Sequence, residues 1–263
     1  MRQRVSAGGA PPAGAFGRVE VAGEERYCRF AADSVELLDR PAWEPGAAVM
    51  GEAALADCRL LAPVVPGKIV AVGLNYRAHA EEFAMATNAE PILFMKPRTA
   101  VIGPGDAIVR PARSAQVDYE AELVVVVGRR CKDVPPAAAA ACVAGYTCGN
   151  DVTARDLQKV DGQWTRAKSF DTFCPLGPWI VPEAPSPEAR VSARLDGAEV
   201  QHGLVGDMIV SPLELLAFAG GVMTLEPGDV LMTGTPPGVG PLAVGQTVTI
   251  AVDGVGELSN TVA

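Results

Sequence analysis

Three acidic residues, Asp118, Glu120 and Glu122, stand two positions apart in the segment QVDYEAELVVVVG, residues 116–128. If this segment is a strand, its side chains alternate, so the three carboxylates share one face. The valines that follow are apolar at successive positions, which predicts that the strand is buried on both faces there. Carboxylates gathered in poorly solvated surroundings repel one another by several kcal/mol, and a bound cation would remove that cost. The alternative is an exposed edge strand with a polar face.

A further carboxylate, Asp151, closes the segment GYTCGND at a predicted strand-to-helix junction. Aspartate often caps a helix at such a place, and one carboxylate can both cap a helix and bind a cation. A site made of carboxylate and water oxygens selects Mg²⁺, Mn²⁺ or Ca²⁺ rather than zinc. One interpretation of this acidic region is therefore a site for a hard divalent metal ion.

The chain has two histidines, and one of them has an acidic neighbour at helical spacing. His79 precedes Glu82 by three positions in NYRAHAEEF, so the two side chains share a face if the segment is helical. The carboxylate would hold the imidazole tautomer and raise its basicity, as suits a general base near pH 7. The alternative is a chance pair on a surface helix. His202, in the turn-rich EVQHGLVGD, has no acid placed to orient it and is interpreted as structural.

Lys168 follows a tryptophan in WTRAKSFDTFCPLGP and enters an apolar stretch rich in proline and glycine. A lysine in a partly buried segment needs a partner, either a structural carboxylate or the carboxylate of a substrate. The segment TGTPPGVG, residues 233–240, is a turn that exposes backbone N–H groups. It lacks the Gly-Lys-Ser/Thr ending of a phosphate-binding loop. It therefore indicates a tight loop or a cradle for an oxyanion or carboxylate, and argues against a nucleotide site.

Composition narrows the classes of function. The chain has 263 residues, a hydrophobic content of 49% and a formal net charge of −9. The acidic balance argues against a nucleic-acid surface and against binding to an anionic membrane. No apolar run approaches the ~20 residues of a membrane span. Six cysteines without a CxxC pair, together with the lack of a signal peptide, predict reduced thiols in a cytoplasmic protein.

The hydrophobic pattern predicts an α+β protein dominated by strands, with a mixed β-roll or sandwich. GRVEVAGEERYCRF is typical of a hairpin, whereas SVELLDR and GEAALADCRLL carry some helical periodicity. We expect a small N-terminal domain at residues 1–59, with a mobile tail at residues 1–15, and a main domain at residues 60–263. Helices are expected at RAHAEEFAMATNAE, VPPAAAAACVAGY, VTARDLQKVDG and SPLELLAFAGGV.

Together these motifs resemble the fumarylacetoacetate hydrolase family. The resemblance covers residues 60–263 and rests on an ordered series: GLNYRAHAEE, FMKP, GPGDAI, VDYEAELVVVVG, GYTCGNDVTARDLQ, WTRAKSFDTFCPLGP, DMIVSPLELL, LEPGDVLMTGTPPGVG and VDGVGELSN. The series is specific, although each piece alone is not. Residues 1–59 resemble only the variable small N-terminal region of bacterial members.

The resemblance implies a divalent metal, usually Mg²⁺ and sometimes Mn²⁺ or Ca²⁺. The metal would be held by Glu120, Glu122 and Asp151, whereas Asp118 would precede the ligand pair without being a ligand. The family fold is a mixed β-roll, and its members are usually homodimers. No motif of the series is missing from this chain.

The resemblance also implies catalytic and substrate-binding residues. His79 and Glu82 would form the dyad that activates water, carried on a lid that orders over bound substrate. Lys168 would lie near the substrate oxyanion. The positions that would contact substrate oxygens are Arg155, Gln158 and Thr235.

These assignments lead to a hypothesis about function. The substrate would be a small 2-oxo acid such as an acylpyruvate, of the fumarylpyruvate or acetylpyruvate type. The metal would chelate its 2-oxo acid end, and activated water would cleave a C–C bond. The same site would serve a 2-hydroxyhepta-2,4-diene-1,7-dioate isomerase or an oxaloacetate decarboxylase. A metal-stabilised binding domain without catalytic activity is the alternative from another class.

Overall fold

The computed structural model describes residues 9–82 and 90–263. Residues 1–8 of the predicted tail, and residues 83–89 of the predicted helix at 77–90, lie outside the described residues. The described end of the tail is anchored. Ala15 is fully buried, and its carbonyl accepts a hydrogen bond of 2.8 Å from the Phe30 amide.

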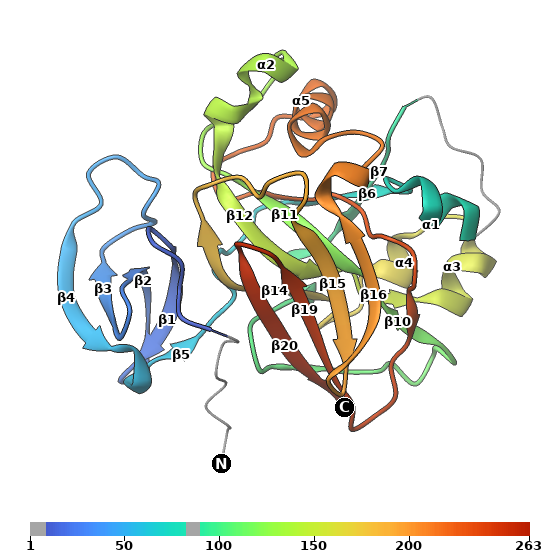
Figure 1. Cartoon of the computed structure of the whole chain (residues 1–263), viewed down its shortest axis with the longest axis horizontal. Helices are drawn as coiled ribbons and strands as arrows, with labels where there is room; N and C mark the ends of the chain where they lie inside the picture. The colour runs from blue at the N-terminus through green and yellow to red at the C-terminus, as the bar shows by residue number, and fades with distance from the viewer. Residues whose placement is uncertain (1–8, 83–89) are drawn as a thin grey trace.

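The N-terminal strands form an antiparallel sheet that continues into the main one (blue in Figure 1). The predicted hairpin is confirmed: β1 (Phe16–Val21) pairs with β2 (Glu24–Phe30) around a tight turn with positive φ at both of its positions, the geometry that suits a twisted hairpin. Strand β1 also pairs with β5 (Arg59–Leu60) and, at its first residue, with β14 (Cys174–Val181). Whether residues 1–59 form a domain of their own stays a prediction.

The helical expectation for the segments after this hairpin is wrong. They form β3 (Ser34–Leu38) and β4 (Val49–Ala54), and only a short 3-10 helix, η1 (Leu55–Asp57), follows. Val35 and Leu38 are buried at the three-residue spacing of a helical stripe. However, β3 is hydrogen-bonded to β2 on one side and to β4 on the other, and this pairing overrides a weak local pattern.

The main sheet is mixed, and the strands at its centre are buried. From β14 its order runs through β12 and β11 to β17, β6 and β7, with β17 parallel to β6 and the other neighbours antiparallel. The bounds are Val143–Asn150 for β12, Ala121–Val127 for β11, Val230–Met232 for β17, Ile69–Gly73 for β6 and Ile92–Lys96 for β7.

A five-stranded sheet packs against β11, β12 and β14 (Figure 1). Its order is β16 (Ala198–Leu204), β15 (Arg190–Leu195), β19 (Thr247–Val252), β20 (Gly256–Val262) and β9 (Ala107–Ile108). This arrangement of packed, mixed sheets confirms the predicted strand-dominated α+β fold with a roll or sandwich of sheets.

The remaining elements are short. A small sheet joins β13 (Thr153–Ala154), β10 (Val117–Tyr119) and β18 (Gly240–Pro241), and β8 (Val101–Ile102) pairs with β14. The α-helices are α1 (Arg77–Glu82), α2 (Pro136–Ala139), α3 (Arg155–Asp161), α4 (Thr165–Lys168) and α5 (Pro212–Val222). The remaining 3-10 helices are η2 (Arg98–Ala100), η3 (Ala140–Cys142) and η4 (Val205–Asp207).

Strand β11 is buried on both faces, as its run of valines predicts. The alternate residues from Leu123 to Val127 face the core that includes the five-stranded sheet. Val124 and Val126 face a second core, formed with β6 and β17. Glu122 precedes them on this second face, because side chains alternate along a strand. A carboxylate therefore begins a row that is otherwise apolar.

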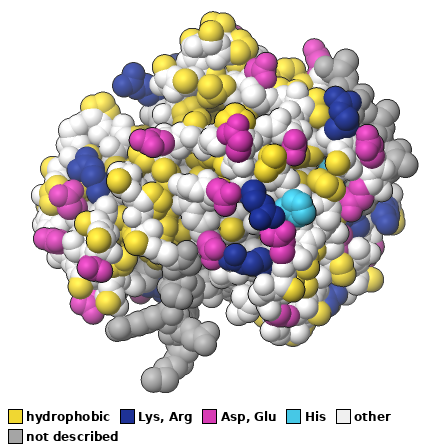
Figure 2. Space-filling view, viewed as in Figure 1, with side chains coloured by type: hydrophobic (Ala, Val, Ile, Leu, Met, Phe, Trp, Pro, Cys, Tyr) yellow, Lys and Arg dark blue, Asp and Glu magenta, His cyan; other side chains and the backbone are white. Residues whose placement is uncertain are grey.

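The surface and the helices bear on possible partners. Among the described residues, no helix is both long and apolar enough to cross a bilayer. On the face drawn in Figure 2, Lys and Arg side chains lie among Asp and Glu side chains rather than in one basic patch. A nucleic-acid surface needs such a patch. That this protein has no nucleic-acid partner stays a prediction.

Asn75 ties the end of β6 to two later loops. Its side-chain NH₂ donates to the carbonyl of Val210 at 2.9 Å and to that of Thr233 at 2.8 Å. Its side-chain oxygen accepts from the Val210 amide at 2.9 Å. Helix α1 starts just after Asn75, and Thr233 opens the TGTPPGVG turn. This buried amide therefore fixes where the helix and the turn meet.

Replacing Asn75 by alanine should lower the free energy of unfolding by about 2–4 kcal/mol, because it leaves buried backbone groups without hydrogen bonds. Urea unfolding followed by circular dichroism measures the change. Gln163→Ala is the control, since this exposed side chain should matter by less than about 0.5 kcal/mol. Equal stability of the two variants would contradict the role given to Asn75.

Candidate metal centre and active site

Three predicted metal ligands meet at one end of the β11–β12 hairpin. Ala121 pairs with Asn150 in this hairpin, so Glu120 and Asp151 follow directly beyond the paired residues. The Asp151 amide donates to the carbonyl of Glu120 at 2.9 Å. Glu120, Glu122 and Asp151 are at most 4% exposed, and each offers an oxygen that lies within 4.8 Å of the others. The strand expected over this whole segment is interrupted at Glu120, between β10 and β11.

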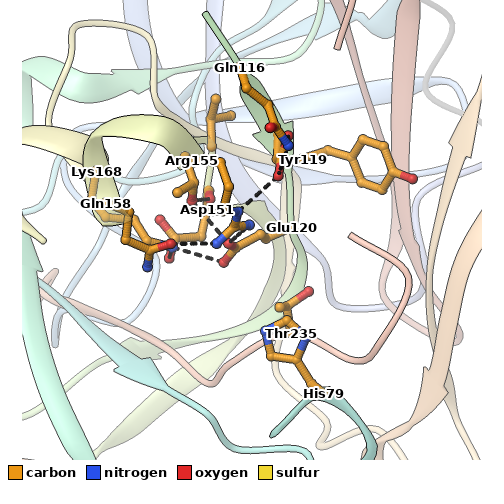
Figure 3. A network of polar contacts seen from close by, with 12 residues as sticks. His79, Gln116, Tyr119, Glu120, Asp151, Arg155, Gln158, Lys168 and Thr235 are labelled. Carbon is orange, nitrogen blue, oxygen red and sulfur yellow. Dashed lines mark hydrogen bonds and ion pairs between the residues drawn. The ribbon is translucent and has the colours of Figure 1, made fainter. Parts of the chain in front are cut away.

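Lysine and arginine side chains surround two of these carboxylates (Figure 3). Lys168 donates to Glu120 Oε2 at 2.9 Å and to Asp151 Oδ2 at 2.7 Å. Arg155 pairs with Glu120 Oε1 at 2.5 Å. Lys96, at the end of β7, pairs with Asp151 Oδ1 and is itself buried. Glu120 and Asp151 are therefore neutralised by protein groups.

The pairing of these cations and carboxylates determines the ionisation of Glu120 and Lys168. Burial raises the pKa of Glu120, but Lys168, Arg155 and His79 outweigh burial and hold that pKa well below its usual range. Burial lowers the pKa of Lys168, but Asp151 and Glu120 reverse the effect and raise it above the ordinary value. Glu120 is therefore a carboxylate, and Lys168 an ammonium, at neutral pH.

Glu122 has a different environment. Among the described residues it forms no ion pair, and its Oε2 accepts a hydrogen bond of 2.8 Å from the Gly234 amide. Burial and the nearby Asp151 and Glu120 carboxylates raise the pKa of Glu122 well above its usual value. A divalent cation placed among the three carboxylates would remove this repulsion and hold Glu122 ionised. The buried oxygen ligands thus fit a hard divalent ion.

Gly234 can donate to Glu122 only because of its own geometry. Its φ is +94°, in the left-handed region that glycine adopts at no steric cost. An added Cβ would also stand 2.7 Å from the Cβ of Asn75. The TGTPPGVG turn therefore supports a carboxylate of the candidate metal centre. Of the two interpretations of this segment, a tight loop and a cradle for an oxyanion or carboxylate, the structure is closer to the tight loop.

Asp118 lies beside the triad and not within it. Its Oδ2 accepts from Arg155 Nε at 2.8 Å, and Gln116 donates to both of its oxygens. Asp118 thereby orients Arg155, which in turn contacts Glu120. This placement agrees with the expectation that Asp118 precedes the ligand pair without being a ligand.

His79 and Glu82 form a pair on α1. The His79 Nδ1 and Glu82 Oε2 atoms are 3.1 Å apart, and His79 is 6% exposed. Glu82 also accepts a hydrogen bond from the Gly238 amide, at 3.2 Å to Oε2. The TGTPPGVG turn thus contacts Glu122 at one end and Glu82 at the other. Glu82 is exposed, but the burial of His79 does not fit the alternative of a chance pair on a surface helix.

One cavity of about 300 Å³ lies between the acidic residues and His79. Glu120, Asp151, Lys168 and His79 line it, as do the predicted substrate-binding residues Arg155, Gln158 and Thr235, and its apolar wall includes Phe94 and Trp164. Gln158 accepts a hydrogen bond of 2.6 Å from Arg155. The Thr235 hydroxyl donates to the carbonyl of Ala121 at 2.9 Å. The catalytic and binding roles of these residues stay predictions.

Lys96 is a residue of the site to which sequence reasoning gave no role. It follows the apolar run ILFM and precedes a proline, and a lysine at the end of a buried strand needs a partner. That signal was present in FMKP, but it could not name Asp151 as the partner. Three strands, β11, β17 and β6, separate β12 from β7 in the sheet, so residue types alone do not reveal that Lys96 meets Asp151.

The expectation for His202 is wrong in one respect. The residue is exposed, as a structural residue can be, but its Nδ1 lies 3.2 Å from Glu199 Oε1. A register shift in the β15–β16 pairing, between Ala193 and Arg194, displaces the alternation of β16 and accounts for two residues three apart meeting on a strand. Glu199 also pairs with Arg190, so this is an exposed charge cluster.

A comparison with known families decides the relationship. The family described as fumarylacetoacetate (FAA) hydrolase C-terminal matches residues 68–263. The chain belongs to the fumarylacetoacetate hydrolase family. Its members include hydrolases and isomerases, so family membership leaves the reaction open.

Two similar structures are isomerases. The 5-carboxymethyl-2-hydroxymuconate delta-isomerase from Mycobacterium smegmatis is 41% identical, with a TM-score of 0.89 over 95% of this chain and 99% of that one. The 2-hydroxyhepta-2,4-diene-1,7-dioate isomerase from Mycobacterium marinum is 40% identical, with a TM-score of 0.88 over 95% of this chain and 98% of that one.

A third relative is a hydrolase. Fumarylpyruvate hydrolase from Pseudomonas aeruginosa, in complex with Mn²⁺ and pyruvate, is 34% identical to this member of the fumarylacetoacetate hydrolase family. Its TM-score is 0.71, over 75% of this chain and 90% of that one. The family therefore contains a structure with a divalent metal ion, and the buried acidic triad of this chain could bind one.

The raised pKa of Glu122 predicts how metal-free stability depends on pH. A carboxyl whose folded pKa lies above its unfolded value binds its proton more tightly in the folded state. Stability is therefore lost as the pH rises from about 4.5 through the folded pKa. Glu122→Gln removes this loss, so in EDTA the variant should unfold at least about 2–4 °C above the wild type at pH 8, with a smaller difference at pH 5.

Thermal unfolding at both pH values, with EDTA and with Mn²⁺, measures this effect. Mn²⁺ should raise the unfolding temperature of the wild type more than that of the variant. If Glu122→Gln is less stable than the wild type in EDTA at pH 8, the repulsion assigned to Glu122 is wrong.

Proposed function

We propose that this protein is a divalent-metal-dependent hydrolase that cleaves a C–C bond in a 2-oxo acid of the acylpyruvate type. One observation carries the proposal: Glu120 and Asp151 of the buried acidic triad line one cavity with Lys168 and with His79, whose imidazole contacts Glu82. A protein that only binds a cation needs the triad alone. The added base and the buried ammonium favour catalysis over a metal-stabilised binding domain.

The metal would be held by Glu120, Glu122 and Asp151. When bound, a Mg²⁺ or Mn²⁺ ion supplies Lewis-acid polarisation and a template for the 2-oxo acid. The P. aeruginosa hydrolase binds Mn²⁺ and the 2-oxo acid pyruvate, which supports a divalent metal and a 2-oxo acid as the ligands of this chain.

His79 is the proposed general base. If Nδ1–H donates to Glu82, Nε2 is the unprotonated nitrogen of the imidazole and can accept a proton from water. The Gly238 amide holds Glu82 in turn, so the imidazole is oriented by a chain of contacts. The hydroxide formed would attack the distal carbonyl of the substrate, and the bond to the pyruvate part would break.

Lys168 is the proposed stabiliser of the leaving enolate. It lines the cavity as a charged ammonium, 5.1 Å from the centre of the Phe94 ring. A fixed cation in a poorly solvated site stabilises a developing oxyanion more than water does. Arg155 is held by Asp118, Glu120 and Gln158, which favours a supporting role over a direct contact with substrate.

Isomerisation is the second candidate. The two isomerases are more similar in sequence to this chain than the hydrolase is, at 41% and 40% against 34% identity. On a hydroxydiene dioate, His79 would move a proton from the 2-hydroxyl group to a carbon atom of the diene instead of activating water. Decarboxylation of oxaloacetate, a third reaction, needs enolate stabilisation and no base.

The cellular context and assembly are proposals as well. We propose a cytoplasmic protein that forms a homodimer, as the family resemblance implies. Light scattering of the purified chain measures the mass in solution. A monomer at micromolar concentration would contradict the dimer.

The reaction can be identified with His79→Ala and Glu122→Gln, assayed with Mg²⁺ or Mn²⁺ on acetylpyruvate, fumarylpyruvate, oxaloacetate and the hydroxyheptadiene dioate. His79→Ala should lower hydrolysis by ~10²–10⁴-fold and spare decarboxylation. Glu122→Gln and EDTA should abolish every activity. His202→Ala is the matched control, because this histidine also has a glutamate partner but is exposed.

Three outcomes would contradict the proposal in different ways. Full activity of Glu122→Gln would show that the metal assignment is wrong. Turnover of the diene dioate without hydrolysis of either acylpyruvate would favour the isomerase. No turnover of any 2-oxo acid, with EDTA having no effect, would favour the binding domain.

A further inference from the structure

The buried cations of the cavity already have protein partners. Lys168 is shared between Glu120 and Asp151, and Arg155 contacts Asp118, Glu120 and Gln158. Neither group has its full charge available for a second anionic group of a substrate. A cation that would bind such a group must come from elsewhere on the cavity wall.

Lys159 is such a cation. It lines the same cavity and is exposed to solvent. Within residues 9–82 and 90–263, no carboxylate pairs with its ammonium and no hydrogen bond engages it. Its charge is therefore available to a ligand in the cavity.

The register of α3 places Lys159 at the outer end of the cavity. Arg155, Gln158 and Lys159 lie three and four positions apart, so they share one face of the helix. Arg155 is 5% exposed and contacts Glu120 at the inner end. Lys159 lies four residues after Arg155, which is ~6 Å along the helix axis, and is exposed to solvent. Lys159 thus marks the mouth of the cavity.

Part of the cavity wall is apolar. Phe94 and Trp164 stand at 5.3 Å between ring centres and 77° between planes, and both line the cavity. Trp164 packs directly over Gly73, where any Cβ would collide with its ring. A charged inner end, an apolar part of the wall and a cation exposed at the outer end match a ligand with an acid group at each end and a carbon chain between.

We infer that Lys159 binds a second carboxylate of the substrate, so that the preferred acyl group ends in a carboxylate. This inference rests on the proposed function for the orientation of the 2-oxo acid end toward the triad. A methyl-ended acyl group, as in acetylpyruvate, leaves Lys159 without a partner. The chain's net charge of −9 repels a dianion in solution, and a cation at the mouth offsets that repulsion locally.

The test compares ligands that differ only at the far end. 2-Oxoadipate and 2-oxohexanoate have the same length and the same 2-oxo acid, and neither has the second carbonyl that hydrolysis requires. Titration calorimetry of the Mn²⁺-loaded full chain should give about tenfold tighter binding of 2-oxoadipate. Lys159→Met keeps most of the apolar stem and should abolish this preference, while Lys159→Arg should restore most of it.

Kinetics give a second readout. For Lys159→Met, kcat/KM on fumarylpyruvate should fall about tenfold through KM, while acetylpyruvate should change less than about twofold. Lys132→Met is the control, because Lys132 is also partly exposed but pairs with Asp133 and Gly221, away from the cavity.

The outcomes separate the two proposals. A preference for 2-oxoadipate that Lys159→Met abolishes supports the inference even if no acylpyruvate is turned over, in which case the proposed hydrolysis fails by itself. Equal binding of both ligands by the wild type, or a preference that survives in Lys159→Met, overturns it. Equal losses on both acylpyruvates also overturn it, since they indicate a general structural role.

Discussion

The constraint on which the rest of this structure depends is the repulsion among three buried carboxylates whose oxygens lie within 4.8 Å of one another. Such a group is stable only if rigid elements hold it and cations neutralise it. Strand β11, buried on both faces, supplies the rigidity. Lys96, Lys168 and Arg155 supply the charge, and each comes from a different element. The neutralisation of the carboxylates therefore requires β7, α3 and α4 to meet at the end of the β11–β12 pair.

The same constraint couples the metal centre to the proposed base. The TGTPPGVG turn donates one amide to Glu122 and another to Glu82. Asn75 fixes the start of this turn to the residue before α1. A displacement of the turn would therefore disturb a metal ligand and the orientation of His79 together. This coupling gives a physical reason for the composition of the turn: glycine permits the positive φ at Gly234 and Gly238, and proline limits the freedom of the backbone.

Sequence reasoning reached the features that depend on local order. The alternation of side chains and the run of valines predicted β11. The ordered series of motifs assigned Glu120, Glu122 and Asp151 to one metal site. Sequence reasoning failed where long-range pairing decides. Val35 and Leu38 suggested a helix because nothing local reveals a strand on each side. The contact of His202 with Glu199 follows from a register shift, which residue types do not disclose. The pairing of Lys96 with Asp151 likewise joins residues that are far apart in the sequence.

Charge balance also limits how a substrate can lie in this cavity. If Glu122 is protonated, three negative charges remain at the metal centre, on Asp118, Glu120 and Asp151. Three buried cations, Lys96, Arg155 and Lys168, pair with these carboxylates. A divalent ion that replaces the Glu122 proton leaves one positive charge, which a single substrate carboxylate neutralises. A second carboxylate at this depth would be buried without a partner, at a cost of several kcal/mol. A substrate with two must direct one outward, and Lys159 stands where it would emerge.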